Sequence, residues 1–121
     1  MAATTRRLLI VDDEQRICHV LEEFFSTRGL SVTSAYSGEE AMARLNEGPF
    51  DVVLIDILLP GIHGIEVLKR ARQVSATVRV VMMTGLQDDE LRAQAQAYGA
   101  DAYITKPFDL TDQTWSAVLN P

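Results

Sequence analysis

The stretch DVVLIDILLPGIHG, residues 51–64, decides the fold of this chain. Its consecutive branched apolar residues at 52–55 predict a β-strand that is buried on both faces. The run ends in the carboxylate of Asp56, and a charge is costly inside a sheet. We therefore expect Asp56 at the carboxyl end of a central strand, where Pro60-Gly61 turns the chain toward the next helix.

The same unit, an apolar strand followed by an amphipathic helix, recurs on both sides of this stretch. Strands are expected over residues 8–11, 30–35, 51–56, 78–83 and 102–105. Helices are expected over residues 14–28, 37–46, 64–74 and 88–98, and from about 109 or 111 to 119. This alternation predicts an α/β fold, with a doubly wound parallel sheet covered by helices on both faces.

Composition and charge limit the possible functions. A chain of 121 residues with 47% hydrophobic residues is long enough for one domain, residues 1–121, with its own core. The net charge of −6 argues against a nucleic-acid-binding surface, and no apolar run is long enough to span a membrane. A single cysteine, Cys18, cannot form an internal disulfide, so the cytoplasm is the expected location.

Polar residues of related chemistry follow the expected strands, and the carboxyl ends of parallel strands meet at one edge of a sheet. These residues are Asp12, Asp13, Asp56, Thr84 and Lys106. Converging carboxylates repel one another unless a cation lies among them, and oxygen ligands suit Mg²⁺. With a lysine and a hydroxyl added, the set is typical of phosphoryl transfer to aspartate, although each residue alone could be a cap, turn or surface residue.

Four motifs carry a resemblance to a known family: LLIVDDE (8–14), LIDILLPGIHG (54–64), VMMTG (81–85) and YGADAYITKPF (98–108). Through them the chain resembles the receiver domain of two-component response regulators, in the CheY-like superfamily. The resemblance covers essentially the whole length. It implies a flavodoxin-like, five-stranded parallel sheet with strand order 2-1-3-4-5.

The resemblance also implies the chemistry of the site. Asp56 would accept a phosphoryl group from a sensor histidine kinase or phosphotransfer protein. Mg²⁺ (or Mn²⁺) would be bound by Asp13 and Asp56, by Asp12 largely through water, and by the backbone carbonyl of Leu58. Lys106 would contact the phosphoryl oxygens, and its bond to the following proline would be cis.

A switch is implied as well. Thr84 would donate to the phosphoryl group, and Tyr103 would change rotamer with it. The surface formed by the fourth helix, the last strand and the last helix would then change, and would control an effector domain or a homodimer. The fourth helix has little apolar area in its own sequence, which predicts a loosely held element.

Two leucines, Leu58 and Leu86, follow Asp56 and Thr84 by two residues each. Neither side chain can orient a water molecule or act as a base. We therefore expect the aspartyl phosphate to be hydrolysed slowly.

Three further residues lie outside this set. Trp115 is expected either to pack on the sheet or to form an exposed aromatic anchor for a partner. His63 is interpreted as a solvated loop residue near the site, and His19, beside Cys18, as a surface residue.

Other functions fit parts of the pattern. A Mg²⁺-dependent phosphatase or phosphotransferase would need a second acid near the nucleophile, which Ile57 and Leu58 do not supply. A receiver-like interaction module without phosphorylation is a third interpretation, against which the complete set of site residues argues. The sequence leaves open whether the chain is a stand-alone regulator or part of a longer protein.

Overall fold

Five parallel strands and five helices alternate along the chain, as the computed structural model of residues 5–85 and 89–120 shows. The strands are β1 (Arg7–Val11), β2 (Ser31–Ala35), β3 (Val52–Asp56), β4 (Arg79–Thr84) and β5 (Ala102–Thr105). The helices are α1 (Gln15–Ser26), α2 (Gly38–Glu47), α3 (Gly64–Val74), α4 (Asp89–Ala97) and α5 (Ser116–Leu119). Among the helices of these residues, the structure contains none that has the length and apolar character to cross a membrane.

The sheet has the order β2-β1-β3-β4-β5, which confirms the predicted topology. Every residue of β3 is buried, because strands lie on both of its edges and helices on both of its faces. Its last residue, Asp56, is paired in register with Met83 near the end of β4. The carboxyl ends of the central strands therefore lie together, at the edge where the order of the strands reverses.

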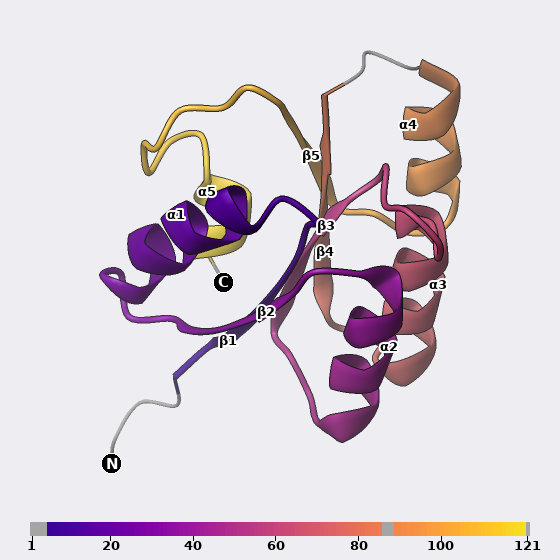
Figure 1. The fold of residues 1–121 in the computed structure, drawn as a ribbon, viewed down its shortest axis with the longest axis horizontal. Coiled ribbons are helices and arrows are strands. Elements are labelled where there is room, and N and C mark those ends of the chain that lie inside the picture. Colours follow the sequence, from indigo (N-terminus) through magenta and orange to yellow (C-terminus); the bar gives the residue numbers. More distant parts are fainter. Residues whose placement is uncertain (1–4, 86–88, 121) are drawn as a thin grey trace.

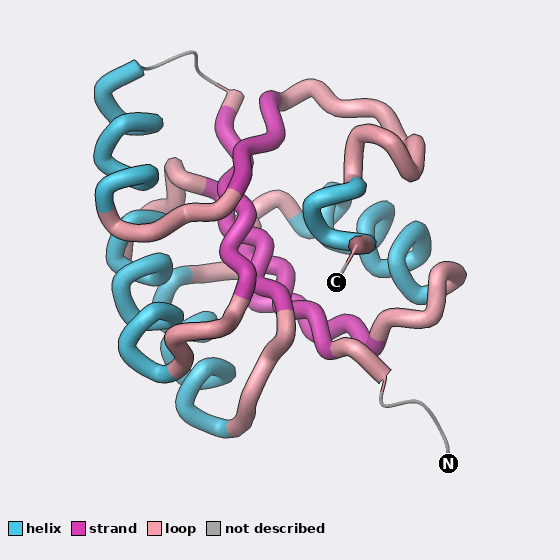
Figure 2. The backbone as a smooth tube through the Cα atoms, turned by 180° about the vertical axis from the view of Figure 1, so that it is seen from behind, coloured by secondary structure: helices cyan, strands magenta, loops and turns pink. Residues whose placement is uncertain are grey.

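Helices cover the two faces of the sheet unequally: α1 and α5 lie on one face, and α2, α3 and α4 lie on the other (Figures 1 and 2). Alternate residues of β1 serve the two layers. Leu8 and Ile10 belong to the cluster that includes α1, whereas Leu9 and Val11 belong to the cluster that includes α2 and α3. Both clusters are apolar throughout, as expected of a sheet buried on both faces.

Local capping fixes where several helices begin and end. The Ser37 hydroxyl accepts a hydrogen bond of 3.0 Å from the Glu40 amide, so α2 begins where the sequence predicts. Gly29 follows α1 with φ +89°, a backbone conformation that favours glycine. His63 caps α3, because its Nδ1 accepts from the Ile65 amide at 3.2 Å. The interpretation of His63 as merely a solvated loop residue missed this role, whereas His19 is exposed as expected.

Within the described part of α4, Ala95 is the buried residue. This agrees with the small apolar area of the helix in the sequence. By contrast, α1 on the opposite face buries Cys18, Leu21, Phe24 and Phe25.

The predicted last helix is wrong over most of its length, because only residues 116–119 are helical. Side chains in the preceding segment bond locally and compete with a helical backbone. Asp109 accepts hydrogen bonds from the hydroxyls of Thr111 and Thr114, and the Thr111 hydroxyl accepts from the Thr114 amide. The segment before α5 is therefore not helical: residues 112–115 form turns, and α5 is a single helical turn.

Trp115 packs into the core, which decides between the two expectations for this residue. Its side chain is fully buried, and its ring makes edge-on contacts with Phe25 and Phe108 at centroid distances of 5.5 and 4.8 Å. Its indole N–H donates to the carbonyl of Asp109 at 2.9 Å. Trp115 thus anchors α5 and the turns before it to α1.

Two arginines at the amino ends of β1 and β4 bind the end of α5. Arg6 donates to the carbonyls of Val118 and Leu119 at 2.8 and 2.9 Å. Arg79 donates to the carbonyls of Ala117 and Asn120 at 3.0 and 2.7 Å. These carbonyls have no partners within so short a helix, and cations at a helix C-terminus are favourable.

Replacing Trp115 with alanine should lower the free energy of unfolding by about 3–5 kcal/mol, because it removes a fully buried aromatic side chain. Denaturant unfolding followed by circular dichroism measures this loss. Tyr98→Ala is the control: Tyr98 is 46% exposed, and its replacement should cost less than about 1 kcal/mol. Equal losses in the two variants would contradict the packing described for Trp115.

Candidate functional site

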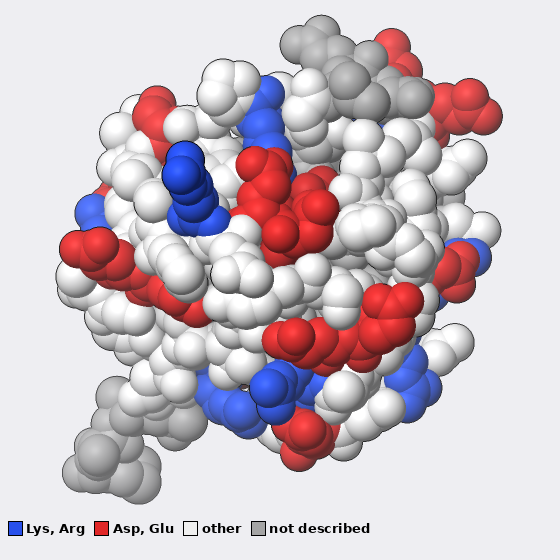
Figure 3. All heavy atoms as spheres, viewed as in Figure 1, with Lys and Arg blue, Asp and Glu red and all other residues white. Residues whose placement is uncertain are grey.

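The edge formed by the carboxyl ends of the strands brings the predicted acidic residues together. Asp12 and Asp13 follow β1, and Asp56 ends β3. One carboxylate oxygen from each of the three lies within 4.8 Å of the others. Figure 3 shows acidic side chains gathered above the middle of the molecular surface in that view, with a basic side chain adjoining them.

Backbone contacts fix Asp12 in a buried position. Its amide donates to the carbonyl of Ala35 at 3.1 Å, which continues the pairing of β1 with β2. Its carboxylate accepts from the Glu14 amide at 2.9 Å, so it bonds to the turn that leads into α1. The thiol of Cys18 donates to the carbonyl of Asp12 at 3.4 Å. Asp12 is consequently fully buried, whereas its neighbour Asp13 is exposed.

Asp56 is held by the loop that follows it. Its Oδ1 accepts from the Leu58 amide at 3.0 Å, and only 6% of the residue is exposed. Gly64 packs against this loop, and its amide donates to the carbonyl of Ile57 at 3.0 Å. A Cβ on Gly64 would come within 2.2 Å of the carbonyl oxygen of Asp56, so the loop requires glycine at this position.

Lys106 places its ammonium group among these acids. Its Nζ lies 2.7 Å from Oδ2 of Asp12, 3.0 Å from Oδ2 of Asp56 and 3.5 Å from Oε1 of Glu14. Its backbone amide donates to the carbonyl of Thr84 at 2.8 Å, and its bond to Pro107 is cis, as expected. Asp12, Asp56 and Lys106 were expected at the same edge of the sheet, whereas the contact with Glu14 was not predicted.

Burial and pairing shift the pKa values of this pair. Burial raises the pKa of Asp56 above its ordinary value, and the charge of Asp12 adds to this, although the hydrogen bond and charge of Lys106 oppose it. Burial alone would lower the pKa of Lys106. The hydrogen bonds to Asp12 and Asp56 and their charges outweigh burial, so the pKa of Lys106 is raised. The lysine therefore stays charged at neutral pH.

The structure describes three of the remaining predicted residues: Thr84, Leu58 and Tyr103. Thr84 is the last residue of β4 and is buried. Leu58 lies two residues after Asp56, in the loop that follows β3, and is 43% exposed. Tyr103 lies on β5, with its hydroxyl donating to the carbonyl of Arg92 on α4 at 2.8 Å. Leu86 lies outside the described residues.

The chemistry of the acidic residues fits a hard divalent cation. Three carboxylates converge, and one of them, Asp13, is open to solvent, so an ion could keep part of its hydration shell. Mg²⁺ binds in this manner, with few protein ligands and several water molecules, and Mn²⁺ accepts the same oxygen ligands. A single lysine does not neutralise three carboxylates, which leaves a net negative charge to attract the ion.

The pKa of Asp56 predicts how its replacement affects stability. Because the folded-state pKa is raised, the charged carboxylate is less favourable in the folded chain than in the unfolded one. Asp56→Asn should therefore have the higher free energy of unfolding at pH 7 without divalent cations. The difference should shrink as the pH falls through the folded-state pKa, because the wild-type carboxyl then becomes neutral. Urea unfolding at several pH values checks this; a gap that widens toward low pH would contradict it.

Comparison with known proteins identifies the family to which this site belongs. Residues 8–115 match the family described as "Response regulator receiver domain". Transcriptional regulatory protein ResD of Bacillus subtilis is 36% identical over 102 residues, which are 84% of this chain and 42% of ResD. Transcriptional regulatory protein DltR of Streptococcus agalactiae is 35% identical, over 85% of this chain and 46% of DltR. The chain thus spans less than half the length of these relatives.

Solved structures agree with the sequence relatives. A CheY-like receiver domain protein from Methanospirillum hungatei has a TM-score of 0.88 and 31% identity, and the match covers 93% of this chain and 90% of that one. A putative response regulator from Chloroflexus aurantiacus has a TM-score of 0.86 and 34% identity, with 97% of each chain covered. With its sheet order and its matching sequence, the chain belongs to the response regulator receiver family.

Proposed function

We propose that this chain is the phosphoacceptor switch of a two-component phosphorelay, with residues 1–121 forming one receiver domain. The observation that carries the proposal is the position of Asp56. Its buried carboxylate lies 3.0 Å from the ammonium group of Lys106 and within a cluster of three acids. A carboxylate nucleophile beside a fixed positive charge is suited to accept a phosphoryl group.

In the proposed reaction, a carboxylate oxygen of Asp56 attacks the phosphorus of a phosphohistidine on a sensor kinase or phosphotransfer protein. The new O–P bond forms as the N–P bond breaks, and the electron pair of that bond returns to the imidazole nitrogen. The Leu58 amide and Lys106 orient the two oxygens of Asp56 from different sides. Lys106 and the Thr84 hydroxyl would then stabilise the charge on the phosphoryl oxygens.

Asp12, Asp13, Asp56 and the carbonyl of Leu58 would hold Mg²⁺ or Mn²⁺. When bound, the ion would neutralise negative charge on the acids and on the phosphoryl group. Lys106 bridges Asp12 and Asp56, so it already supplies part of this neutralisation.

Phosphorylation would add a charge of about −1.5 to −2 and three acceptor oxygens at Asp56. Thr84 would turn toward the new group, and Tyr103 would move into the space that Thr84 leaves. The helix beside Tyr103 is α4, which buries little and is suited to shift. The face of α4, β5 and α5 would then bind an effector domain or a second copy. Relatives such as ResD are named transcriptional regulatory proteins. We therefore propose that the chain acts in the cytoplasm and that its effector controls transcription.

Incubation with a small-molecule phosphodonor and Mg²⁺ should add one phosphoryl group, which intact-mass spectrometry detects. Asp56→Asn should give no adduct, because the nucleophile is lost. Asp112→Asn should behave as the wild type, since this exposed acid pairs with Arg28 away from the cluster. The absence of any adduct on the wild-type protein, with or without Mg²⁺, would favour a phosphorylation-independent interaction module.

Replacing Leu58 with asparagine should shorten the lifetime of the aspartyl phosphate by about tenfold or more. An amide at this position can orient a water molecule that leucine cannot, while a fully positioned general base contributes about 10²–10⁴-fold. The decay of the adduct in the mass spectrum measures the lifetime. Leu110→Asn is the matched control, because Leu110 is similarly exposed, at 45%, and lies beside α1. An unchanged lifetime in Leu58→Asn would refute slow hydrolysis through an apolar approach.

A further inference from the structure

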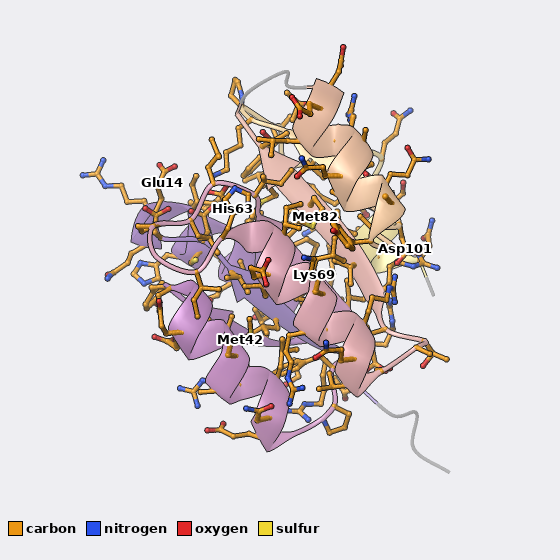
Figure 4. The ribbon with its side chains drawn as sticks, turned by 90° about the vertical axis from the view of Figure 1, so that its right-hand side faces the viewer. Glu14, Met42, His63, Lys69, Met82 and Asp101 are labelled. Carbon is orange, nitrogen blue, oxygen red and sulfur yellow. The ribbon has the colours of Figure 1, made fainter. Side chains whose placement is uncertain are left out.

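The C-terminal end of α4 is fastened to α3. Arg72 donates to the carbonyl of Gly99 through Nε at 3.0 Å and through Nη2 at 2.6 Å, and it pairs with Asp101 at 2.6 Å. The ammonium group of Lys69 lies 4.2 Å from the ring centroid of Tyr98. Figure 4 shows Lys69 on α3 and Asp101 beyond the end of α4. These contacts make this end a suitable fixed point for any movement of the helix.

The middle of α4 is held in a different way, by two contacts between Arg92 and Tyr103. The Tyr103 hydroxyl donates to the backbone carbonyl of Arg92 at 2.8 Å. The guanidinium group of Arg92 lies over the Tyr103 ring, 4.9 Å from its centroid. One residue of α4 therefore holds both the polar tip and the face of this tyrosine. A cation over an aromatic ring is attracted by the ring quadrupole.

We propose that Arg92 is a positioning residue that holds Tyr103 against α4 and so favours the unphosphorylated state. We call this pair of contacts the Arg92–Tyr103 latch. The inference rests on the proposed function, in which Tyr103 leaves its present position after phosphorylation. Such a movement breaks the hydroxyl contact and withdraws the ring from the guanidinium group. Ala95 is the buried residue of described α4 and Leu91 packs partly buried against the same cluster, so the latch adds to a small apolar contact.

Arg92→Met should shift the equilibrium toward the activated state. The backbone carbonyl remains, but the attraction between the guanidinium group and the ring is lost. From the usual strength of an exposed cation–π contact, the affinity for a phosphoryl analogue should rise about 2- to 5-fold. The variant should at the same time be slightly less stable than the wild type. A merely structural role for Arg92 predicts the loss of stability without the gain in affinity.

The test measures binding of beryllofluoride, a phosphoryl analogue, in the presence of Mg²⁺ by isothermal titration calorimetry. The variants are Arg92→Met, Arg92→Lys and the control Arg70→Met. Arg92→Lys keeps a cation near the ring and should restore an affinity close to that of the wild type. Arg70 on α3 donates hydrogen bonds to Asn46 on α2 and to Gln73 on α3. Because these bonds do not involve Tyr103, the replacement of Arg70 should leave the affinity unchanged.

The outcomes separate the latch from the function on which it rests. If the wild type binds beryllofluoride and Arg92→Met binds it no more tightly, the latch is refuted while the phosphoacceptor function stands. If the wild type does not bind the analogue at all, the proposed function fails and the regulatory role of the latch fails with it. Tighter binding by Arg92→Met but not by Arg70→Met supports the latch.

A double-mutant cycle tests the contact itself without phosphorylation. The free energies of unfolding of Arg92→Met, Tyr103→Leu and the double variant are compared with the wild type. The sum of the two single losses in the free energy of unfolding should exceed the loss in the double variant, because both substitutions remove the same interaction. Additive losses would show that the two side chains are energetically independent, and would overturn the latch.

Discussion

The ammonium group of Lys106 lies between carboxylates that come from two neighbouring strands, and the site depends on this contact. Asp12 is fully buried and Asp56 nearly so, and each has an oxygen within 3.0 Å of this nitrogen. Removing the lysine would leave the two buried carboxylates without this positive charge, and an uncompensated buried charge typically costs about 3–5 kcal/mol. Through Lys106, the end of β5 is tied to the ends of β1 and β3. The edge of the sheet that carries the chemistry is thus also a point where distant strands are joined.

The sequence predicted the sheet order and the meeting of the acids with Lys106 at one edge, because both follow from burial and topology. Three apolar runs and two short mixed runs define five parallel strands, and the residues that follow the strands must meet at one edge. Asp12, Asp56 and Lys106 are brought together by this rule alone, with no knowledge of side-chain positions. Glu14 escaped notice because its contact with Lys106 depends on how α1 begins, which the strand pattern does not specify.

Prediction failed where side chains compete with the backbone or act over long distances. A helix was expected to begin near residue 109 or 111. Instead, Asp109, Thr111 and Thr114 bond to one another, and only residues 116–119 are helical. The cap from His63 is missed because histidine is not a usual capping residue. The contacts of Arg6 and Arg79 with α5 join parts of the chain that are far apart in sequence, so no local pattern reveals them.

The single cysteine of the chain lies directly beneath the acidic centre, yet it is chemically quiet. Burial, with the charges of Asp12 and Glu22, raises the pKa of Cys18 to about 12, so at neutral pH almost none of it is thiolate. Oxidation and alkylation both proceed through the thiolate. Little thiolate is therefore available to peroxide or to glutathione, although the sulfur contacts the backbone of Asp12.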